Sequence, residues 1–572
     1  MKKGKYLSKN KLYKEIEVNN YRELIDNCAE KYRDRIAFSY RDDSKKLVNI
    51  SYVEYKKQVE NFGTMLLNMN LKEMKIGLIS PDRYEWCVSY IAIVNSNNIV
   101  VPLDFALPDL EIETLINRSN IECIIFDSKY LELIKKIVKK ENCKLKYAIC
   151  FDYNKEEDNI LSYKELLNKG QKLIGNGDKS YRNISVDKDK MSILLFTSGT
   201  TSNSKAVMLS QYNVCCNVTG MTTLIKPVKD DNVLIFLPLH HTLACTASFL
   251  SCFWMGFRIY FADSIKNVAK NMKEYKIKGL VCVPAVLELM YKRAIKEIKK
   301  QNKYVAFKIL SVISNVLYKL NIDVRRKVFK NVLEGFGGNL EKIIYGSAST
   351  KKEIIKFFNT IGVNMQQGYG LTEASPIVAS ESDYFNSTTS VGYPLFNQEV
   401  KIDNKDKDGI GEIIVKGSNV MLGYYEDELM TKKIIKNEWL YTGDLGFFDK
   451  KGRLHIAGRK KDVIVFKNGK KVNPEELEKV INDSKYIEES LIYGEIQKNG
   501  DYKICTKVVY SIDNILLKDK TEQQIEQIIN EEIKKINSNL PIYKHIYKVK
   551  VTTKSFEKTT TRKIKRFAEI ES

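Results

Sequence analysis

The chain has 572 residues, more than one hydrophobic core usually serves, so we expect two or more domains, which its 44% of hydrophobic residues can fill. Lysine and arginine exceed aspartate and glutamate by 93 − 71 = 22, but no basic run is interleaved with aromatic residues, which argues against a nucleic-acid partner. The eleven cysteines include no CxxC pair and no Cys/His metal spacing, which indicates a reduced, cytoplasmic chain.

Two segments bear on export and membrane insertion. The first, MKKGKYLSKNKLYKEIEV, is basic but has no apolar stretch behind it, so we do not expect a signal peptide. The second, residues 232–257, carries no formal charge and is long enough to cross a bilayer. Because Pro238 and two adjacent histidines interrupt it, we predict a buried strand, a loop and a buried helix instead.

The first half of the chain alternates short apolar segments with amphipathic ones. Residues 75–80, 99–104 and 121–127 have the pattern of buried strands, and residues 84–97 and 107–120 between them have that of helices. This alternation predicts βαβ units around a mostly parallel sheet. The strand pattern returns at residues 191–196, 233–239, 279–284 and 342–348.

After about Gly392 the pattern changes from crossovers to hairpins. The turn sequences DKDG (406–409) and DKKG (449–452) lie beside alternating segments at 411–417 and 453–459. The hairpins predict a separate β-subdomain.

A compact α+β pattern follows Gly458. Residues 462–473 predict a hairpin, and Asn473 with Pro474 predicts a helix start at which Glu476 would complete a capping box. A later helix is predicted to begin at Thr521, with isoleucines on one face. These are Ile525, Ile528, Ile529, Ile533 and Ile536. We therefore predict an N-terminal domain of residues 1–458 and a C-terminal domain of residues 459–572.

The segment FTSGTTSNSKAVMLS (196–210) has the composition of an anion-binding loop. Gly199 and Lys205 have the spacing of a Walker loop, but Ser204 replaces its second glycine and Ala206 its magnesium-binding hydroxyl. The residues that follow also predict a strand, whereas a Walker loop opens a helix. A hydroxyl-rich turn whose backbone N–H groups wrap phosphate remains, with a plain solvated turn as the alternative.

TSGTTSNSK followed by MLS resembles the phosphate loop of the adenylate-forming (AMP-binding) superfamily. Four further segments resemble that family in the same order: GSAS (346–349), QGYGLTE (367–373), WLYTGDLGFFDKKGRLHIAGRKKD (439–462) and KTTTRKIKR (558–566). The resemblance covers nearly the whole chain and is greatest to long-chain fatty-acyl-CoA ligases. It implies an α/β fold: a large N-terminal domain of mostly parallel sheets flanked by helices, with a β-hairpin subdomain, and a small mobile α+β C-terminal domain.

The resemblance implies a nucleotide site. Its phosphate loop would consist of Thr197, Ser198, Gly199, Thr200, Thr201 and Lys205. Its adenine wall would consist of Gly346, Ser347, Ala348, Gln367, Gly368, Tyr369 and Gly370. Thr372 would contact the α-phosphate, and Glu373 would bind Mg²⁺, which takes oxygen ligands; an exposed helix start is the alternative for Glu373.

Further roles follow from the same resemblance. Asp444 would accept hydrogen bonds from the ribose hydroxyls and Arg459 would reach the ribose or phosphate; a turn aspartate and a surface arginine are the alternatives. Lys563 would stabilise charge during adenylation, although Arg562 stands where many relatives have glycine. Lys461 would be the hinge between the two domains. Gly469 would line the CoA path, or serve as a simple hairpin glycine.

The predicted substrate is a fatty acid. Amino-acid-activating relatives generally place an aspartate just after the strand equivalent to residues 233–239, whereas this chain has His240-His241-Thr242 there and no acid until Asp263. A buried substrate ammonium would then lack a partner. The uncharged residues 243–257 predict an apolar acyl pocket, and His241 resembles the family's gate beside the substrate carboxylate, with histidine packing as the alternative.

We therefore predict an acid–thiol ligase that uses ATP, Mg²⁺ and CoA to convert a fatty acid to acyl-AMP and then acyl-CoA. A carrier-protein phosphopantetheine is the alternative acceptor, and a non-catalytic nucleotide- or lipid-binding relative is the alternative class. We also expect any membrane contact to be peripheral, through exposed apolar and basic side chains near the acyl entrance.

Overall fold

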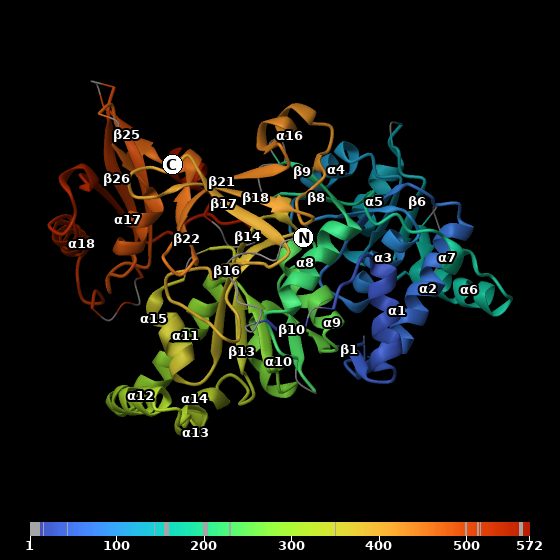
Figure 1. Ribbon diagram of the computed structural model, residues 1–572, viewed down its shortest axis with the longest axis horizontal. Helices are drawn as coiled ribbons and strands as arrows, with labels where there is room; N and C mark the ends of the chain where they lie inside the picture. The colour runs from blue at the N-terminus through green and yellow to red at the C-terminus, as the bar shows by residue number, and fades with distance from the viewer. Residues whose placement is uncertain are drawn as a thin grey trace.

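Figure 1 shows the computed structural model of the chain. The structure describes residues 12–571 except 15, 43, 142, 154–159, 198–203, 228–229, 349, 469, 498–499, 512–513, 515 and 560–563. Two large sheets form the N-terminal part, and three smaller sheets follow toward the C-terminus. The α/β fold class predicted from the sequence is confirmed.

The first large sheet has eight strands in the order β19-β9-β8-β4-β3-β5-β6-β7. Strands β4, β3, β5, β6, β7 and β8 run parallel, as the alternating pattern predicted. Strand β9 is antiparallel to β8, and β19 is antiparallel to β9. The bounds are β3 Lys75–Ile79, β4 Ile99–Pro102, β5 Cys123–Phe126, β6 Tyr147–Cys150, β7 Ile160–Ser162, β8 Met191–Phe196, β9 Ala206–Ser210 and β19 Gly423–Tyr424.

Helices cover both faces of this sheet because its strands are apolar on both sides. One face packs against α1 Tyr21–Tyr32, α2 Tyr52–Asn68, α3 Tyr84–Asn95, α6 Tyr163–Gly175 and the short α7 Ser180–Asn183. The other packs against α4 Asp109–Arg118, the 3₁₀ turn η2 Ser128–Tyr130 and α5 Leu131–Val138.

The second large sheet has nine strands in the order β16-β15-β14-β13-β12-β10-β11-β1-β2. Its central strands from β14 to β1 are parallel, and the strands at both edges are antiparallel. The bounds are β1 Ile36–Arg41, β2 Leu47–Ser51, β10 Asn232–Ile235, β11 Arg258–Phe261, β12 Gly279–Cys282, β13 Lys342–Tyr345, β14 Asn364–Gly370, β15 Ile377–Ser380 and β16 Tyr393–Pro394.

The uncharged stretch 232–257 lies in the core between the two sheets. It forms β10, a loop, the π-helix η3 Leu243–Ser251 and α9 Cys252–Trp254, and it packs beside α8 Gln211–Thr222. The prediction of strand, loop and buried helix is therefore confirmed, although the strand ends at Ile235, before Pro238. Among the described residues, no helix combines the length and the apolar character needed to cross a membrane.

The opposite face of the nine-stranded sheet is covered by a helical layer at the lower edge of Figure 1. It consists of η4 Ile265–Asn267, α10 Val268–Glu274, α11 Pro284–Lys300, α12 Tyr304–Lys319, α13 Arg325–Val328, α14 Lys330–Glu334 and α15 Lys352–Thr360.

The predicted hairpins form a five-stranded antiparallel sheet, which confirms the β-subdomain. Strand order is β17-β18-β21-β20, with β22 paired to β21. The bounds are β17 Gln398–Asp403, β18 Gly411–Gly417, β20 Ile435–Lys436, β21 Trp439–Phe448 and β22 Leu454–Arg459, and α16 Glu428–Ile434 precedes β20.

The C-terminal part has its own core of isoleucine, valine and leucine side chains. Its elements are η6 Lys460–Asp462, β23 Ile464–Val465, β24 Lys471–Val472, α17 Pro474–Ile481, β25 Glu489–Ile496, β26 Tyr502–Val509, α18 Glu522–Asn537, η7 Ile542–Lys544, β27 Lys548–Thr552 and α19 Arg566–Glu571. The domain boundary at 458/459 stays a prediction.

Two helices in the C-terminal part were predicted to have particular N-terminal caps, and the structure agrees fully for one of them only. Thr521 caps α18 with a complete capping box, and the predicted isoleucine face packs into the core. Asn473 caps α17, but the predicted capping box with Glu476 is wrong: the Glu476 carboxylate instead accepts two hydrogen bonds from Lys544 Nζ at 2.7 and 2.8 Å.

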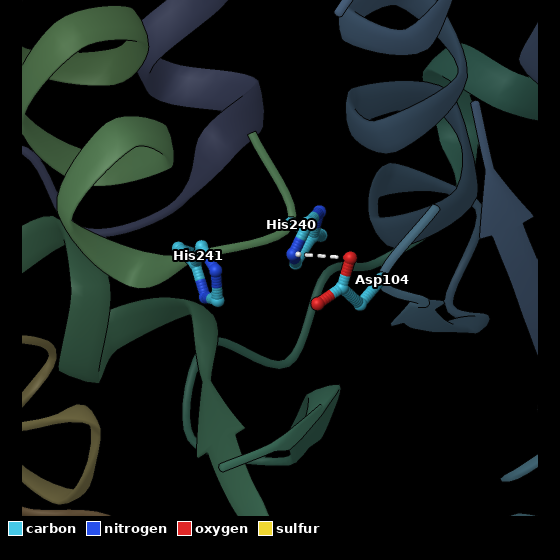
Figure 2. A group of neighbouring side chains, drawn as sticks. All are labelled: Asp104, His240 and His241. Carbon is cyan, nitrogen blue, oxygen red and sulfur yellow. Dashed lines mark ion pairs between the residues drawn. The ribbon is translucent and has the colours of Figure 1, made fainter. Parts of the chain in front are cut away.

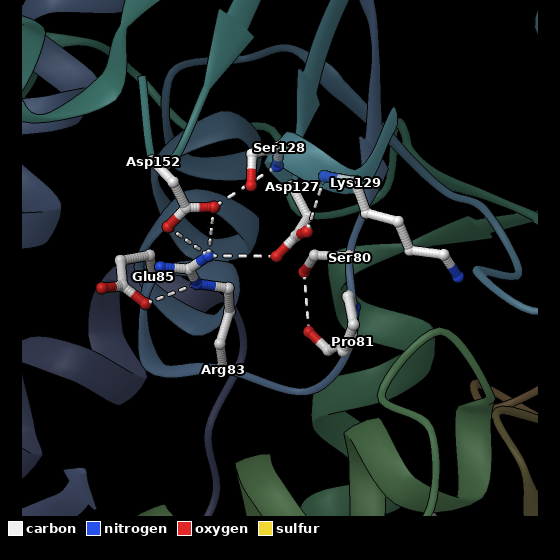
Figure 3. Close-up of polar contacts among 8 residues, drawn as sticks. All are labelled: Ser80, Pro81, Arg83, Glu85, Asp127, Ser128, Lys129 and Asp152. Carbon is white, nitrogen blue, oxygen red and sulfur yellow. Dashed lines mark hydrogen bonds and ion pairs between the residues drawn. The ribbon is translucent and has the colours of Figure 1, made fainter. Parts of the chain in front are cut away.

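An arginine fixes the carboxyl ends of three parallel strands of the eight-stranded sheet. Arg83, at the start of α3, donates to Asp127 after β5 (3.2 Å) and to Asp152 after β6 (2.9 and 3.0 Å), and its Nε donates to Glu85 (2.8 Å), as Figure 3 shows. These charge-assisted contacts hold the segment after β3 in place, and that segment carries Asp82.

All eleven cysteines are free thiols, and ten of them are buried. Burial raises the pKa of most of these thiols above the usual value, for example at Cys87 and Cys282. They therefore behave as small apolar core side chains.

Candidate active site

The phosphate-loop segment joins two antiparallel strands. Backbone N–H of Thr197 donates to the carbonyl of Lys205 (2.9 Å), and Lys205 N–H donates to Oγ1 of Thr197 (3.2 Å), which closes the neck of the loop. Because β9 follows, the Walker alternative is excluded. Arg118 of α4 donates to the side chain and carbonyl of Ser204, both at 3.0 Å. Four predicted phosphate ligands lie outside the described residues: Ser198, Gly199, Thr200 and Thr201.

Lys205 and Glu373 are joined through a tyrosine that the sequence analysis missed. Lys205 Nζ donates to the hydroxyl of Tyr424 (3.2 Å), and that hydroxyl donates to Oε1 of Glu373 (2.8 Å). Tyr424 lies in β19, paired with β9, and its side chain is buried. Burial, and then the Glu373 carboxylate, raise the pKa of Tyr424 well above its usual value, so the hydroxyl stays a donor.

Glu373 therefore does not lie at an exposed helix start. It is half-buried in the 3₁₀ turn η5 Thr372–Ala374, directly after β14. Its carboxylate is held beside the cation of Lys205 by Tyr424. A carboxylate oxygen of this kind is a suitable ligand for a hard divalent cation.

The residues predicted to flank the adenine lie where β13 ends, beside the middle of β14. Tyr345 and Gln367 are register partners, which brings the following Gly346 and Gly368 together. A Cβ on Gly346 would lie 3.1 Å from the carbonyl oxygen of Gly368, and a Cβ on Gly370 would overlap the carbonyl of Pro376. The close backbone approach therefore requires glycine at 370 and leaves little room for a side chain at 346, whereas a Cβ on Gly368 would make ordinary contacts of 3.7 Å or more.

Asp444 lies in β21 and its carboxylate receives two partners. The hydroxyl of Tyr369 donates to Oδ2 (2.7 Å), and Nε of Arg459, the register partner of Asp444 in β22, lies 2.8 Å from Oδ1. Asp444 is 5% exposed and lies within β21, so the turn alternative for Asp444 is wrong, whereas the Arg459 side chain is 42% exposed and its role stays a prediction. Held by these two partners, the carboxylate presents its acceptor oxygens in a fixed direction.

His241 lies beside two side chains that the sequence analysis did not assign. Asp104 follows β4 of one large sheet and His240 and His241 follow β10 of the other, so the carboxyl ends of both sheets meet here (Figure 2). Nε2 of His240 lies 3.4 Å from Oδ1 of Asp104, and the two imidazole rings are 4.1 Å apart between centroids. The three side chains are close enough to share a metal ion.

Asp82 completes the surroundings of the histidines. Its carboxylate accepts the backbone N–H of Leu239 at 2.8 Å. Burial raises the pKa of Asp82 to about 7, although this hydrogen bond and the neighbouring His240 lower it. Near neutral pH, the charge beside His240 therefore depends on pH.

A pocket lined mainly by apolar side chains lies beside Gly346 and Gly368. It is lined by Met221, Leu224, Ile225, Leu243, Ile344, Tyr345, Gly346, Gln366, Gly368, Ile377, Ser380 and Glu381. Of the predicted acyl-pocket stretch 243–257, Leu243 lines it, whereas the later residues pack in the core between the sheets. Two further residues of the stretch, Cys245 and Thr246, line a second cavity together with His240 and Thr242, and an acyl pocket at this stretch stays a prediction.

Glu381 is the one acidic side chain in the lining of that pocket. It is 1% exposed, and one carboxylate oxygen accepts the backbone N–H of Gln367 at 2.7 Å. Burial raises the pKa of Glu381 to about 8, so the carboxyl is mostly protonated at neutral pH.

The remaining predicted residues fall in two groups. Thr372 opens η5, Ser347 has a positive φ of 76° next to Ala348, and Lys461 lies in η6, directly after β22. Gly469 and Lys563 lie outside the described residues.

The comparisons with known proteins agree with this geometry. Residues 25–425 match the AMP-binding enzyme family, and residues 461–571 match the AMP-binding enzyme C-terminal domain. The chain therefore belongs to the AMP-binding enzyme family. Over 90% of this chain and 80% of the relative, it is 27% identical to fatty acyl-CoA synthetase B of Dictyostelium discoideum.

Two further matches concern the acyl acceptor and the fold. The chloroplastic long-chain-fatty-acid–[acyl-carrier-protein] ligase AEE15 of Arabidopsis thaliana is 27% identical over 82% of this chain and 74% of its own length. The solved structure of the anthranilate CoA ligase AuaEII with anthranoyl-AMP matches with a TM-score of 0.76 and 17% identity, over 99% of this chain and 98% of that one. The fold is thus that of adenylate-forming ligases.

Proposed function

We propose that the protein is a ligase that activates a long-chain fatty acid with ATP and transfers the acyl group to CoA. The observation that carries this proposal is the presence of two polar networks near Gly346, Gly368 and the apolar pocket. One network joins Lys205, Tyr424 and Glu373, and the other joins Tyr369, Asp444 and Arg459. The family and the named relatives support it.

In the first half-reaction, a substrate carboxylate oxygen attacks the α-phosphorus of ATP, and pyrophosphate leaves. Two anions must approach each other, so the protein's main contribution is electrostatic positioning. Lys205 would hold the β- and γ-phosphates, Asp444 would accept the ribose hydroxyls, and Arg459 would lie between ribose and phosphate. His241 would contact the carboxylate at the mouth of the apolar pocket.

Glu373 would hold the Mg²⁺ that accompanies ATP. The half-buried carboxylate beside Lys205 supplies the oxygen ligand that a hard cation takes, so the residues present fit the ion. When bound, Mg²⁺ neutralises phosphate charge. Tyr424 keeps the Glu373 carboxylate in position for it.

In the second half-reaction, the thiol attacks the acyl carbonyl and AMP leaves. The domain boundary at 458/459, a hinge at Lys461, a CoA path past Gly469 and a role for Lys563 in adenylation remain proposals taken from the family resemblance. The position of Lys461 in a short turn directly after Arg459 supports the hinge, because a rotation there would move the C-terminal part without disturbing β22.

Pyrophosphate release tests the proposal, measured with MgATP and fatty acids of graded length, with and without CoA. Release that requires a fatty acid, followed by acyl-CoA formation when CoA is added, is the expected result. Acyl-AMP that forms normally but transfers only to a phosphopantetheine carrier protein would favour the second candidate, which the AEE15 relative supports. If no fatty acid causes pyrophosphate release, the alternative of a non-catalytic nucleotide- or lipid-binding protein would be favoured.

A further inference from the structure

Helix α12 has an unusual arrangement of apolar and polar side chains. Its sequence, YVAFKILSVISNVLYK, is mostly apolar, yet Ser314 is its single buried residue. The polar side chains face the protein: Asn315 donates to Oγ1 of Thr360 on α15 (3.2 Å), and the Ser314 hydroxyl donates to the carbonyl of Ser311 (3.3 Å). Tyr304 and Phe307 also pack against the core, so α12 is apolar on its outer face as well, whereas a surface helix normally has a polar outer face.

The outward face of α12 is a continuous aliphatic stripe. Val305 is 70% exposed, Val312 is 66% exposed and Leu320, directly after the helix, is 64% exposed. The spacing of 4, 3, 1, 3 and 4 residues places all members of the stripe on one side of the helix. They are Val305, Ile309, Val312, Ile313, Val316 and Leu320.

Basic side chains surround this stripe. From Lys299 to Lys330 the chain has nine lysines and arginines and one acid, Asp323, a difference of 9 − 1 = 8. Asp323 is itself paired with Arg325 at 2.7 Å. The exposed members are Lys299, Lys300, Lys303, Lys308, Lys319, Lys327 and Lys330. Two of them, Lys308 and Lys319, are three turns apart and border the stripe along one edge.

We propose that α12 docks the protein onto an anionic lipid bilayer, with its aliphatic stripe in the headgroup–acyl boundary and its lysines on the lipid phosphates. An amphipathic helix with this combination lies in the plane of the interface. At 16 residues it is too short to cross the hydrocarbon layer. Figure 1 shows α12 at the edge of the molecule, with α11, α13 and α15 packed against it on the inner side, so a flat surface can reach its outer face.

The positive charge around α12 favours an anionic bilayer over a second copy of the chain as the binding partner. In a two-fold pair built on α12, the lysine rims of the two copies would face each other, and like charges across an interface oppose association. Anionic lipid headgroups complement both the stripe and the rim, and each lysine near such a surface contributes about 1 kcal/mol, or about a fivefold change in partitioning. This proposal depends on the surface of the protein and does not rest on the proposed reaction.

Vesicle flotation tests it, with the full chain mixed with vesicles of phosphatidylcholine alone or with about one third phosphatidylglycerol. We expect binding to the anionic vesicles that salt weakens. The double variant Ile309→Gln/Val312→Gln should bind at least about tenfold more weakly. Lys308→Gln/Lys319→Gln should lose most of the preference for anionic vesicles.

The matched control is Leu110→Gln/Leu429→Gln, which removes two leucines that are 75% and 86% exposed on α4 and α16. It should bind as the unaltered chain does, and thermal melting should show that all variants fold. Equal binding by the stripe variant and the control would overturn the proposal, as would a chain that binds neither kind of vesicle. A dimer in light scattering that the stripe variant dissociates would assign the face to a second copy and overturn it as well.

Discussion

Replacing Tyr424 with phenylalanine tests whether the link between Lys205 and Glu373 serves catalysis. The change removes one hydroxyl that lies 3.2 Å from Lys205 Nζ and 2.8 Å from Glu373 Oε1, and it keeps the buried ring. A hydrogen bond to a charged group contributes about 1.5–3 kcal/mol. If that energy is lost in the transition state, kcat/KM for ATP falls by about 10- to 150-fold.

The assay is ATP–pyrophosphate exchange at saturating fatty acid, with a melting curve for each variant. Tyr425→Phe is the control, since it removes the adjacent hydroxyl, whose contact with Nδ2 of Asn120 is long at 3.4 Å. We expect Tyr425→Phe to exchange within about twofold of the unaltered chain. Equal rates for both variants, or a loss in Tyr424→Phe that follows a collapse of its melting temperature, would refute a positioning role for this hydroxyl.

Three further outcomes follow from the site. Asp444→Asn keeps the shape but removes the charge opposite Arg459, so KM for ATP should rise by at least about tenfold in steady-state kinetics; an unchanged KM would contradict the ribose contact. Glu381 has its pKa raised from 4.5 to about 8, so the folded state holds the extra proton and stability falls as pH rises from about 4.5 to 8, by at most about 5 kcal/mol. Glu381→Gln should flatten this dependence in urea titrations, whereas Glu132→Gln, at an exposed position, should leave it unchanged; equal slopes would refute the assignment. Lys461→Pro should slow thioester formation far more than acyl-AMP formation in single-turnover assays, and equal losses would count against the hinge.

Most of the fold could be predicted because the patterns that specify it are local. The alternation that gave β3, α3, β4, α4 and β5 depends on residues within a few positions of one another. Strand β10 is shorter than predicted because its apolar run continues into Pro238, which has no backbone N–H to extend the sheet.

The site could be predicted only where contiguous motifs resembled a family. Tyr424 lies 219 residues from Lys205 and gave no signal by itself, because its role depends on β19 pairing with β9. Asp104 likewise gains its position from the meeting of two sheets. Such pairs depend on tertiary topology, which spacing along one chain does not encode. Sequence periodicity also did not reveal that the η3 side chains from Ala244 to Ser251 are all buried.

The burial of the cysteines has a practical consequence for following motion in this protein. Ten thiols are shielded from solvent, and Cys143 is the one that is half-buried. A Cys143→Ser chain should therefore be nearly silent toward maleimides under native conditions. Single cysteines introduced on α12 or on the C-terminal part could then carry fluorophores or spin labels without dismantling the interior, which makes insertion depth and interdomain distances accessible in one background.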